Sequence, residues 1–263
     1  MSVQLSLLML QLESRDSSAL CDSIRKQIAQ APPGSVEFLF ERDNGELTSG
    51  QKRNRLMSRC TGDRVAFIDD DDLISDDYVS SLLSACADSD ASVITFNLEM
   101  QFSVLRFRRL IKRTEYWRFH TGNDNRTAGL MSANHLCAWK SSIARKIAWD
   151  DMLGYGDDQL WYKPIINCHH LSLTSFHIEK TLYFYMCNLN QSANQASGKR
   201  DFARRYSGRG LRCYWNNGDI LVEVGQAAHF SRMPTGLVRV RDADNNIKSV
   251  VDDGSHFFSC KIT

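Results

Sequence analysis

An apolar run that ends in four consecutive aspartates limits the possible folds of this chain more than any other feature of the sequence. Val65–Ile68 is short, apolar and partly β-branched, which is typical of a fully buried strand, and Asp69–Asp72 follow it directly. Four like charges beside a buried strand raise one another's pKa values and are costly to desolvate. The junction therefore predicts a cation or a set of hydrogen-bond donors among these carboxylates.

A bound divalent metal ion and a solvated turn are the two explanations of Asp69–Asp72. Carboxylate oxygens suit hard ions such as Mg²⁺ or Mn²⁺, which take one or two carboxylates and complete their shell with water and substrate phosphates. The plainer alternative is an acidic turn that caps a helix starting near Ser75 or Asp76. Because charged groups at the carboxyl ends of strands are where open α/β sheets bind ligands, we favour the metal ion.

The residues before this junction alternate between strand and helix patterns. Val3–Leu12 and Val36–Phe40 are apolar enough for two strands. Between them apolar residues recur every four positions over Leu20–Ile28, which predicts a helix with one apolar stripe. A further buried strand is expected over Ala91–Leu98. This alternation predicts an α/β fold with a mixed, mostly parallel sheet flanked by helices.

A glycine and two cations open the next predicted helix. Thr48–Arg55 reads TSGQKRNR, in which Gly50 precedes Lys52 and Arg53, and the helix pattern continues through Leu56. Cations in a first turn oppose the helix dipole but suit a phosphate group. A solvated helix start is the alternative, and the position of the segment between two acid-ended strands favours the phosphate.

The order GQKRN, helix, GDRVAFIDDDD, helix resembles the amino-terminal half of family-2-type glycosyltransferases of the GT-A fold, the nucleotide-diphospho-sugar transferases. The resemblance covers about Val3 to Glu99 and implies a GT-A, Rossmann-like sheet. It implies Asp71 as a metal ligand, and His177 as a further candidate because some GT-A enzymes place a late histidine on the metal. The residues that it implies for the donor nucleotide are Asp43, Gln51, Arg53, Asn54, Asp69 and Asp70.

Sugar transfer from such a donor needs a second group of residues. Negative charge builds on the departing diphosphate, which calls for a metal ion or cations, and the attacking hydroxyl needs a carboxylate to take its proton. A second block with family likeness, residues 135–161, carries Gly156-Asp157-Asp158 where the family has a glycine and an acidic pair at a helix start. The resemblance implies Asp158 as general base and Asp157 as second candidate. Plain helix capping is the alternative for both acids.

Two segments offer contacts for an acceptor. Phe102–Phe119 interleaves basic and aromatic residues, which is typical of a surface hairpin or of a patch for an anionic acceptor, with Arg109 and Lys112 as candidate contacts. Tyr155 and Trp161 are candidates to flank an acceptor ring, and core packing is the alternative for each. Two acceptors stay open: a saccharide or glycolipid, and DNA with a hydroxylated base, as in phage-type DNA glycosylation.

The resemblance ends near residue 197, where the composition also changes. Residues 198–263 hold a basic stretch and short strand-like runs such as ILVEV and LVRV, separated by turn signals such as NNGD. We therefore expect a GT-A glycosyltransferase domain over 1–197, with a donor half at about 1–100 and an acceptor half at about 101–197. A basic linker and a small β-rich extension are expected over 198–263.

The composition of the whole chain predicts a soluble, cytoplasmic protein. The 32 Lys and Arg residues balance 31 Asp and Glu residues, so the overall charge does not indicate a polyanionic partner. The eight cysteines contain no C-x-x-C pair, which is typical of reduced thiols. No apolar run reaches the ~20 residues of a membrane span, and the first residues lack a secretory pattern.

The sequence as a whole predicts a metal-dependent glycosyltransferase that uses Mn²⁺ or Mg²⁺ and a sugar nucleotide, with a UDP-sugar as the first expectation. Inversion at the anomeric carbon is implied by the family resemblance alone. The alternatives are an inactive nucleotide-sugar-binding module and a Mg²⁺-dependent nucleotidyl or phosphoryl transferase. A nucleotidyltransferase would carry a glycine-rich loop after its first strand, and Glu13–Ser18 contains no glycine.

Overall fold

A computed structural model of the protein shows two compact units. Unit 1 comprises Met1–Leu47, Arg55–Ser141 and Leu173–Asn194, and unit 2 comprises Thr48–Asn54, Ser142–Ser172 and Gln195–Thr263. The structure describes residues 2–106, 109–151, 157–188, 209–216, 219–226, 237–241, 247–251 and 257–261. The domain boundary expected between residues 197 and 198 lies outside the described residues and stays a prediction.

Unit 1 contains a sheet whose first three strands are parallel. β1 (Leu5–Leu12) pairs with β2 (Val36–Asp43) on one side and with β3 (Arg64–Asp69) on the other. The first five residues of β1 and of β3 are buried, as expected for apolar central strands. Leu10 of β1 lies opposite Asp69, so the acidic turn, Asp69–Asp72, begins at the carboxyl edge of the parallel strands.

The other strands of unit 1 extend this sheet in mixed directions. They are β4 (Leu73–Ile74), β5 (Val93–Arg106), β6 (Arg109–His120), β7 (Leu130–Ser132), β8 (Ala138–Lys140) and β9 (Ser175–Asn188). The sheet order is β2-β1-β3-β8-β5-β6-β7, with β9 paired to β5 and β4. β5 is parallel to β9 and antiparallel to β6 and β8, which confirms the expected mixed sheet.

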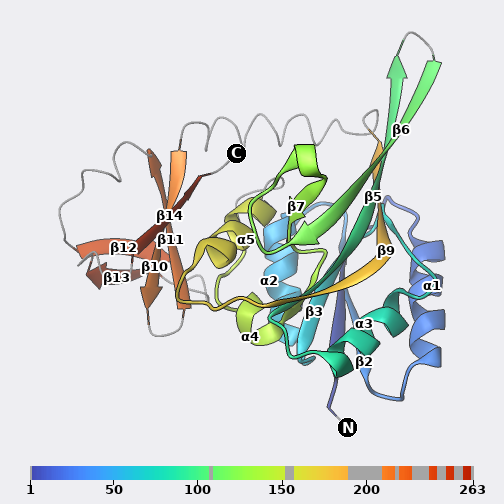
Figure 1. Ribbon diagram of the computed structural model, residues 1–263, viewed down its shortest axis with the longest axis horizontal. Coiled ribbons are helices and arrows are strands. Elements are labelled where there is room, and N and C mark those ends of the chain that lie inside the picture. The colour runs from blue at the N-terminus through green and yellow to red at the C-terminus, as the bar shows by residue number, and fades with distance from the viewer. Residues whose placement is uncertain are drawn as a thin grey trace. The chain divides into compact units, whose positions relative to one another are not determined.

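Helices α1 (Ser18–Gln30) and α3 (Tyr78–Asp88) lie side by side in unit 1 (Figure 1). The predicted apolar stripe of α1 is buried. The Gln27 side chain connects the two helices, since its amide donates to the Ser75 carbonyl at 2.9 Å and accepts from the Val79 N–H at 2.9 Å. A short 3-10 helix, η1 (Arg126–Ala128), follows β6.

Two elements of unit 1 differ from the expected ones. The helix expected near Ser75 begins at Tyr78, because Leu73 and Ile74 first pair with β9 as β4. The strand expected to end at Leu98 continues to Arg106 as β5, because β6 and β9 both pair with this extension. The pairing partners of β4 and of the β5 extension are distant in sequence or lie across a turn, so local sequence patterns do not reveal them. β5 and β6 pair as an antiparallel hairpin, which was one of the two interpretations of Phe102–Phe119, and the acceptor patch stays a prediction.

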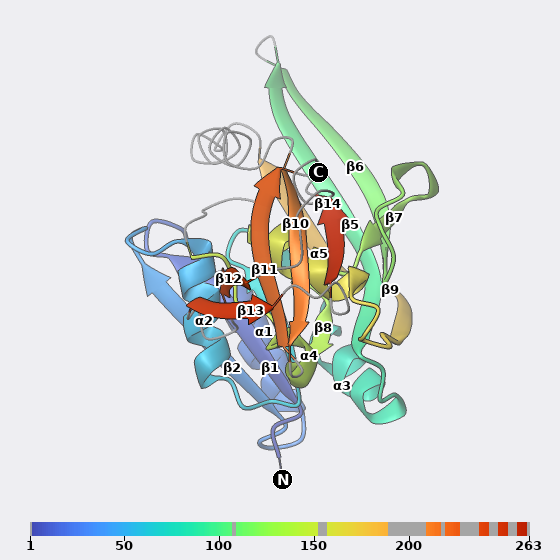
Figure 2. The ribbon, with the colours of Figure 1, turned by 90° about the vertical axis from the view of Figure 1, so that its left-hand side faces the viewer.

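Unit 2 combines short helices with a second sheet. The helices are α4 (Ser141–Ala144), α5 (Asp157–Asn167) and the start of α2 (Ser49–Arg59). The strands are β10 (Arg209–Asn216), β11 (Asp219–Gln226), β12 (Leu237–Arg241), β13 (Ile247–Val251) and β14 (Phe257–Lys261). They form an antiparallel sheet of order β13-β12-β11-β10-β14 (Figure 2). The expected β-rich character of the C-terminal residues is therefore confirmed.

Two expectations from composition concern cysteines and membrane spans. Cys21, Cys60, Cys86, Cys137, Cys168 and Cys213 form no disulfide among the described residues, and the reduced state of the thiols stays a prediction. Within the described ranges, every helix is too short or too polar to cross a membrane.

Candidate functional site

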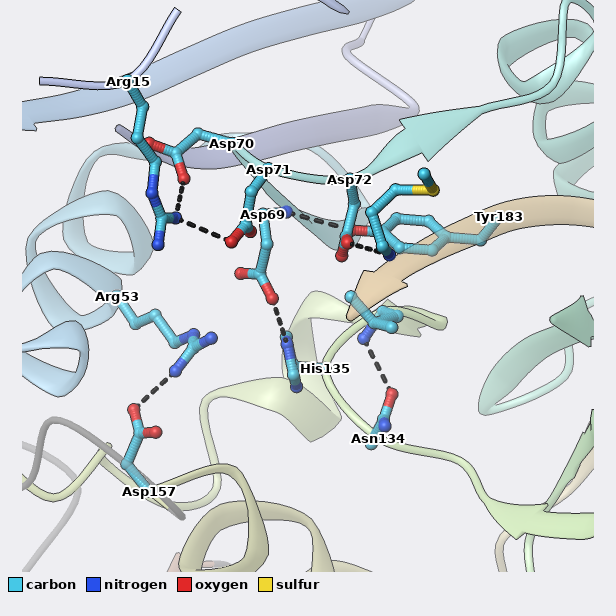
Figure 3. A network of polar contacts seen from close by, with 12 residues as sticks. Arg15, Arg53, Asp69, Asp70, Asp71, Asp72, Asn134, His135, Asp157 and Tyr183 are labelled. Atoms are coloured by element: carbon cyan, nitrogen blue, oxygen red, sulfur yellow. Dashed lines mark hydrogen bonds and ion pairs between the residues drawn. The ribbon is translucent and has the colours of Figure 1, made fainter. Parts of the chain in front are cut away.

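The end of β3 and the turn that follows it carry the four consecutive aspartates, Asp69–Asp72, which differ in exposure as two pairs (Figure 3). Asp70 and Asp72 are buried, with exposed fractions of 6% and 3%. The side chains of Asp69 and Asp71 keep 25% and 44% of their surface exposed. A ligand can therefore reach Asp69 and Asp71, whereas the carboxylates of Asp70 and Asp72 contact protein groups.

Asp70 connects the acidic turn to the end of β1. Its carboxylate accepts a hydrogen bond from the Leu12 N–H at 2.7 Å and another from Arg15 Nη1 at 2.5 Å. The same Arg15 nitrogen lies 3.0 Å from Asp71 Oδ2. Charge-assisted hydrogen bonds offset the cost of burying a carboxylate. The contacts observed for Asp70, a predicted nucleotide contact, thus hold the residues after β1 in place.

Asp72 connects the turn to β9 through Tyr183. The Tyr183 hydroxyl donates to Asp72 at 2.8 Å and accepts from the Asp69 backbone N–H at 3.0 Å, and the Met186 N–H also donates to Asp72 at 2.8 Å. Burial raises the pKa of Asp72 well above its ordinary value, and the nearby charge of Asp69 adds to the rise. The turn is therefore fixed from both sides, by β1 and by β9.

The reachable carboxylates repel each other, and Arg15 offsets part of this repulsion. Burial, with the charges of Asp69 and then Asp70, raises the pKa of Asp71 to about 6, and the Arg15 guanidinium opposes the rise. His135 Nε2 lies 3.4 Å from Asp69 Oδ2. When a carboxylate's charged form is disfavoured in this way, a cation bound to it stabilises that charged form.

The donor set of the turn fits a metal ion that is shared with a substrate. Asp69 and Asp71 offer carboxylate oxygens, the ligands that Mg²⁺ and Mn²⁺ prefer. In the described part of the chain, no group of three His, Cys, Asp or Glu residues is arranged to hold a metal ion. Mg²⁺ commonly uses one or two protein carboxylates together with substrate phosphates and water. The two reachable aspartates suit that arrangement better than a permanent protein-only metal site.

His177, the second predicted metal ligand, contacts β5 instead. Its Nδ1 lies 2.9 Å from Thr95 Oγ1 and its Nε2 lies 3.2 Å from Asn97 Oδ1. Burial, with the charge of Arg118, lowers the pKa of His177, so the neutral ring is favoured. Because no group of three such residues forms among the described ones, the structure does not bring His177 together with the acidic turn as a metal centre.

The other predicted residues of unit 1 lie at the sheet edge or on the hairpin. Asp43 ends β2 and accepts the N–H groups of Gly45 at 3.2 Å and Leu47 at 2.8 Å, which orders the turn that follows. Lys112 is exposed on β6. The side chain of Arg109 lies outside the described residues, as does Tyr155.

In unit 2, the predicted nucleotide contact Gln51 makes local hydrogen bonds, whereas Asn54 bonds to a residue distant in sequence. Gln51 and Thr48 form a capping box: the Thr48 N–H donates to Gln51 Oε1 at 3.0 Å, and the Gln51 N–H donates to Thr48 Oγ1 at 3.2 Å. The Asn54 amide pairs with both backbone groups of Trp149, at 3.0 and 2.9 Å. The start of α2 thereby holds the backbone near Trp149.

Arg53 and Asp157 form a buried ion pair in unit 2. Arg53 Nη1 lies 2.5 Å from Asp157 Oδ2, and their side chains are 6% and 5% exposed. The Arg53 guanidinium also lies 4.6 Å from the centroid of the Trp149 ring, which stacks on Trp161 at 4.6 Å and 9°. Trp161 is 1% exposed, so the structure places this predicted acceptor contact in the core.

The acidic pair at the start of α5 is divided by exposure. Asp157 is 4% exposed and its carboxylate forms an ion pair with Arg53, whereas Asp158 is partly exposed in the same first helical turn. A general base must reach a substrate hydroxyl, so the exposure of the two acids favours Asp158.

Gly50 gives a prediction of its own, because a methyl group cannot fit at this position. A Cβ added to Gly50 would lie 1.7 Å from the Asp150 carbonyl oxygen, which is backbone and cannot rotate away. We expect Gly50→Ala to lower the free energy of unfolding by at least about 2 kcal/mol, measured by urea denaturation. Ser49→Ala, one residue earlier, is the control. Equal stability of the two variants would show that residues 149–151 do not lie against Gly50.

Three residues that contact the acidic turn were not predicted from the sequence: Arg15, His135 and Tyr183. They reach the turn from the end of β1, from the segment before β8 and from β9. Only Arg15 had a readable signal, since it follows a strand whose carboxyl end must share the edge of the sheet with Asp69. The contacts of His135 and Tyr183 depend on pairing between distant parts of the chain.

The comparisons with known proteins agree with this geometry. Residues 16–151 match the profile described as "Glycosyl transferase family 2", which is more than half of the 263 residues. The chain therefore belongs to glycosyl transferase family 2. A comparison with curated proteins found no significant match.

Solved structures of S. aureus TarS are similar in fold. The structure of TarS matches with a TM-score of 0.50 and 12% identity, over 70% of this chain and 37% of that chain. The complex of TarS 1–349 with UDP-GlcNAc matches with a TM-score of 0.49 and 12% identity, over 70% and 58% of the two chains. This chain thus spans little more than half of the TarS 1–349 chain. Together with the family match, the likeness to the TarS structure with a TM-score of 0.50 confirms the expected GT-A fold.

Proposed function

We propose that the chain transfers a sugar from a nucleotide-diphosphate sugar to an acceptor hydroxyl. The observation that carries the proposal is the acidic turn: Asp69 and Asp71 are reachable at the carboxyl edge of parallel strands, while Asp70 and Asp72 are buried and fix the turn. Ligands of open α/β sheets bind at this edge. Membership of glycosyl transferase family 2 supports a sugar nucleotide as the ligand.

The proposed roles follow from the chemistry of the leaving group. Asp71, with Asp69 beside it, would hold Mn²⁺ or Mg²⁺, and such an ion neutralises charge on the departing diphosphate when bound. We further propose Asp158 as the base that takes the proton from the acceptor hydroxyl, with inversion at the anomeric carbon, on the strength of the family pattern. His177 is not part of the proposed metal site, because both its ring nitrogens contact β5 side chains.

For the acceptor, we propose a saccharide or glycolipid rather than DNA. On the described part of β6, Arg113 is paired with Glu115, and Arg118 is paired with Glu179 at 2.5 Å. Neighbouring acids reduce the attraction of these two cations for a polyanion. DNA with a hydroxylated base remains an outcome of the test, and a cytoplasmic location remains a prediction.

The proposed function predicts metal-dependent hydrolysis of a sugar nucleotide in the absence of acceptor. UDP-GlcNAc is the first donor to test, because TarS was crystallised with it, followed by other UDP- and GDP-sugars. We expect hydrolysis with Mn²⁺ that falls at least about tenfold when the metal is chelated. The release of UDP or GDP from each donor, followed by chromatography, measures it.

Three results would contradict parts of this proposal. Binding of a sugar nucleotide without hydrolysis or transfer to any acceptor would indicate an inactive binding module. Release of pyrophosphate or phosphate instead of a nucleoside diphosphate would indicate a nucleotidyl or phosphoryl transferase. Salt-sensitive binding of duplex DNA, with sugar transfer to a hydroxylated base, would replace the saccharide acceptor by DNA.

A further inference from the structure

Arg15 is a cation of unit 1 that contacts the acidic turn of the candidate donor site. It lies in the turn after β1, and its Nη1 contacts Asp70 Oδ1 at 2.5 Å and Asp71 Oδ2 at 3.0 Å (Figure 3). The Arg15 side chain is 43% exposed. It is therefore placed at the edge of the parallel strands while remaining accessible to a ligand.

The Arg15 guanidinium keeps unused hydrogen-bond donors. A guanidinium carries five N–H donors in a fixed plane, and the two contacts with Asp70 and Asp71 both use Nη1. Among the described residues, neither Nε nor Nη2 of Arg15 has a hydrogen-bond partner. Nε and Nη2 form the side of the fork that binds phosphate oxygens bidentately in other proteins.

Asp70 fixes the position of this cation before any ligand binds. Its carboxylate is 4% exposed, and it accepts from the Leu12 N–H as well as from Arg15. Holding a long side chain in advance reduces the conformational entropy lost on binding. The burial of Asp70 is thus explained by a role in presenting Arg15, besides holding the turn.

We propose that Arg15 binds the diphosphate of the sugar-nucleotide donor and stabilises it as a leaving group. This inference rests on the proposed function. In the transfer, the bond between the anomeric carbon and the diphosphate oxygen breaks, and its electron pair stays on that oxygen. The acceptor oxygen bonds to the anomeric carbon, and its proton passes to the base. Arg15 would contact the oxygens on which the negative charge increases.

The test compares UDP and GDP affinity in wild type, Arg15→Ala and Arg15→Lys, by calorimetry of the full chain in EDTA and then in Mn²⁺. We expect Arg15→Ala to weaken binding of the nucleoside diphosphate in EDTA by roughly tenfold to a hundredfold. Arg15→Lys keeps the charge but not the fork, so it should recover part of the affinity. Binding of the matching nucleoside, followed by ligand-observed NMR, should not change because it lacks phosphates.

Arg25→Ala is the matched control, since Arg25 is an arginine of α1 with a 59% exposed side chain that pairs with Asp22. It should bind the nucleoside diphosphate as wild type does. Should Arg15→Ala fail to fold, Arg15→Lys decides, and affinity equal to that of wild type in both EDTA and Mn²⁺ would refute the inference.

The outcomes separate this inference from the proposed function. Wild type that binds neither UDP nor GDP would overturn both. Wild type that binds one of them, with equal affinity in a folded Arg15→Ala, would overturn the role of Arg15 and leave the proposed function standing. A change confined to Mn²⁺ affinity, with unchanged diphosphate binding in EDTA, would also overturn it, because Arg15 would then be only a counter-ion of Asp71.

Discussion

Asp71→Asn is expected to lower donor hydrolysis and sugar transfer by roughly a hundredfold or more, with a change in unfolding free energy of only about 0.5 kcal/mol. Asp71 is the most exposed of the four carboxylates of the acidic turn, and its side chain pairs with Arg15 at 3.0 Å. Asparagine keeps the shape of the side chain but removes the charge that a hard metal ion requires. The loss should therefore appear in catalysis and in Mn²⁺ binding, and not in folding.

Initial rates with the donor found in the hydrolysis screen, together with thermal melting of each variant, measure these effects. Asp76→Asn is the matched control, because Asp76 is an exposed carboxylate five residues further along the chain. We expect it to keep the wild-type rate. A folded Asp71→Asn variant with a rate within about twofold of wild type would remove Asp71 from the proposed site.

The place of the acidic turn could be predicted from sequence because its signal is local. An apolar run followed directly by Asp69–Asp72 specifies a buried strand and a charged end, and the preceding β-α-β pattern specifies the edge of the sheet. The differences between the environments of the four acids are caused by contacts with residues that are distant in sequence. They depend on Leu12 for Asp70, and on Tyr183 and Met186 for Asp72, which lie more than 50 residues away. Periodicity carries no information about such contacts.

The segment at the start of α2 shows a different limit of sequence reasoning. Its glycine and cations favoured a phosphate site, but Gly50 lies against the Asp150 carbonyl and Asn54 pairs with Trp149, 95 residues further on. Gly50 therefore meets a packing requirement that the sequence could not reveal. The capping box of Thr48 and Gln51 was readable, since T-x-x-Q before a helical pattern is a known start signal. The proposed contact between Gln51 and the nucleotide stays a prediction.

Removal of the Arg53 side chain is the second change for which we expect a large effect, in this case on stability. Arg53→Ala is expected to lower the free energy of unfolding by about 3–5 kcal/mol, because it leaves the Asp157 carboxylate buried without its partner. Loss of the contact with the Trp149 ring adds to the cost. Urea denaturation followed by tryptophan fluorescence measures the change, since Trp149 and Trp161 stack beside the pair.

Two further variants show whether the ion pair is the cause of this loss. Arg55→Ala removes an arginine two residues along the same helix, whose side chain is 58% exposed and pairs with Glu41, and should cost less than about 1 kcal/mol. The double variant Arg53→Met with Asp157→Leu removes both charges and should be more stable than Arg53→Ala alone, because no buried charge is left unpaired. If Arg53 instead binds the donor, as the family resemblance implied, Arg53→Ala would unfold at the wild-type urea concentration and show only a raised KM. These two results exclude each other, so one denaturation curve distinguishes a structural role of Arg53 from a role in donor binding.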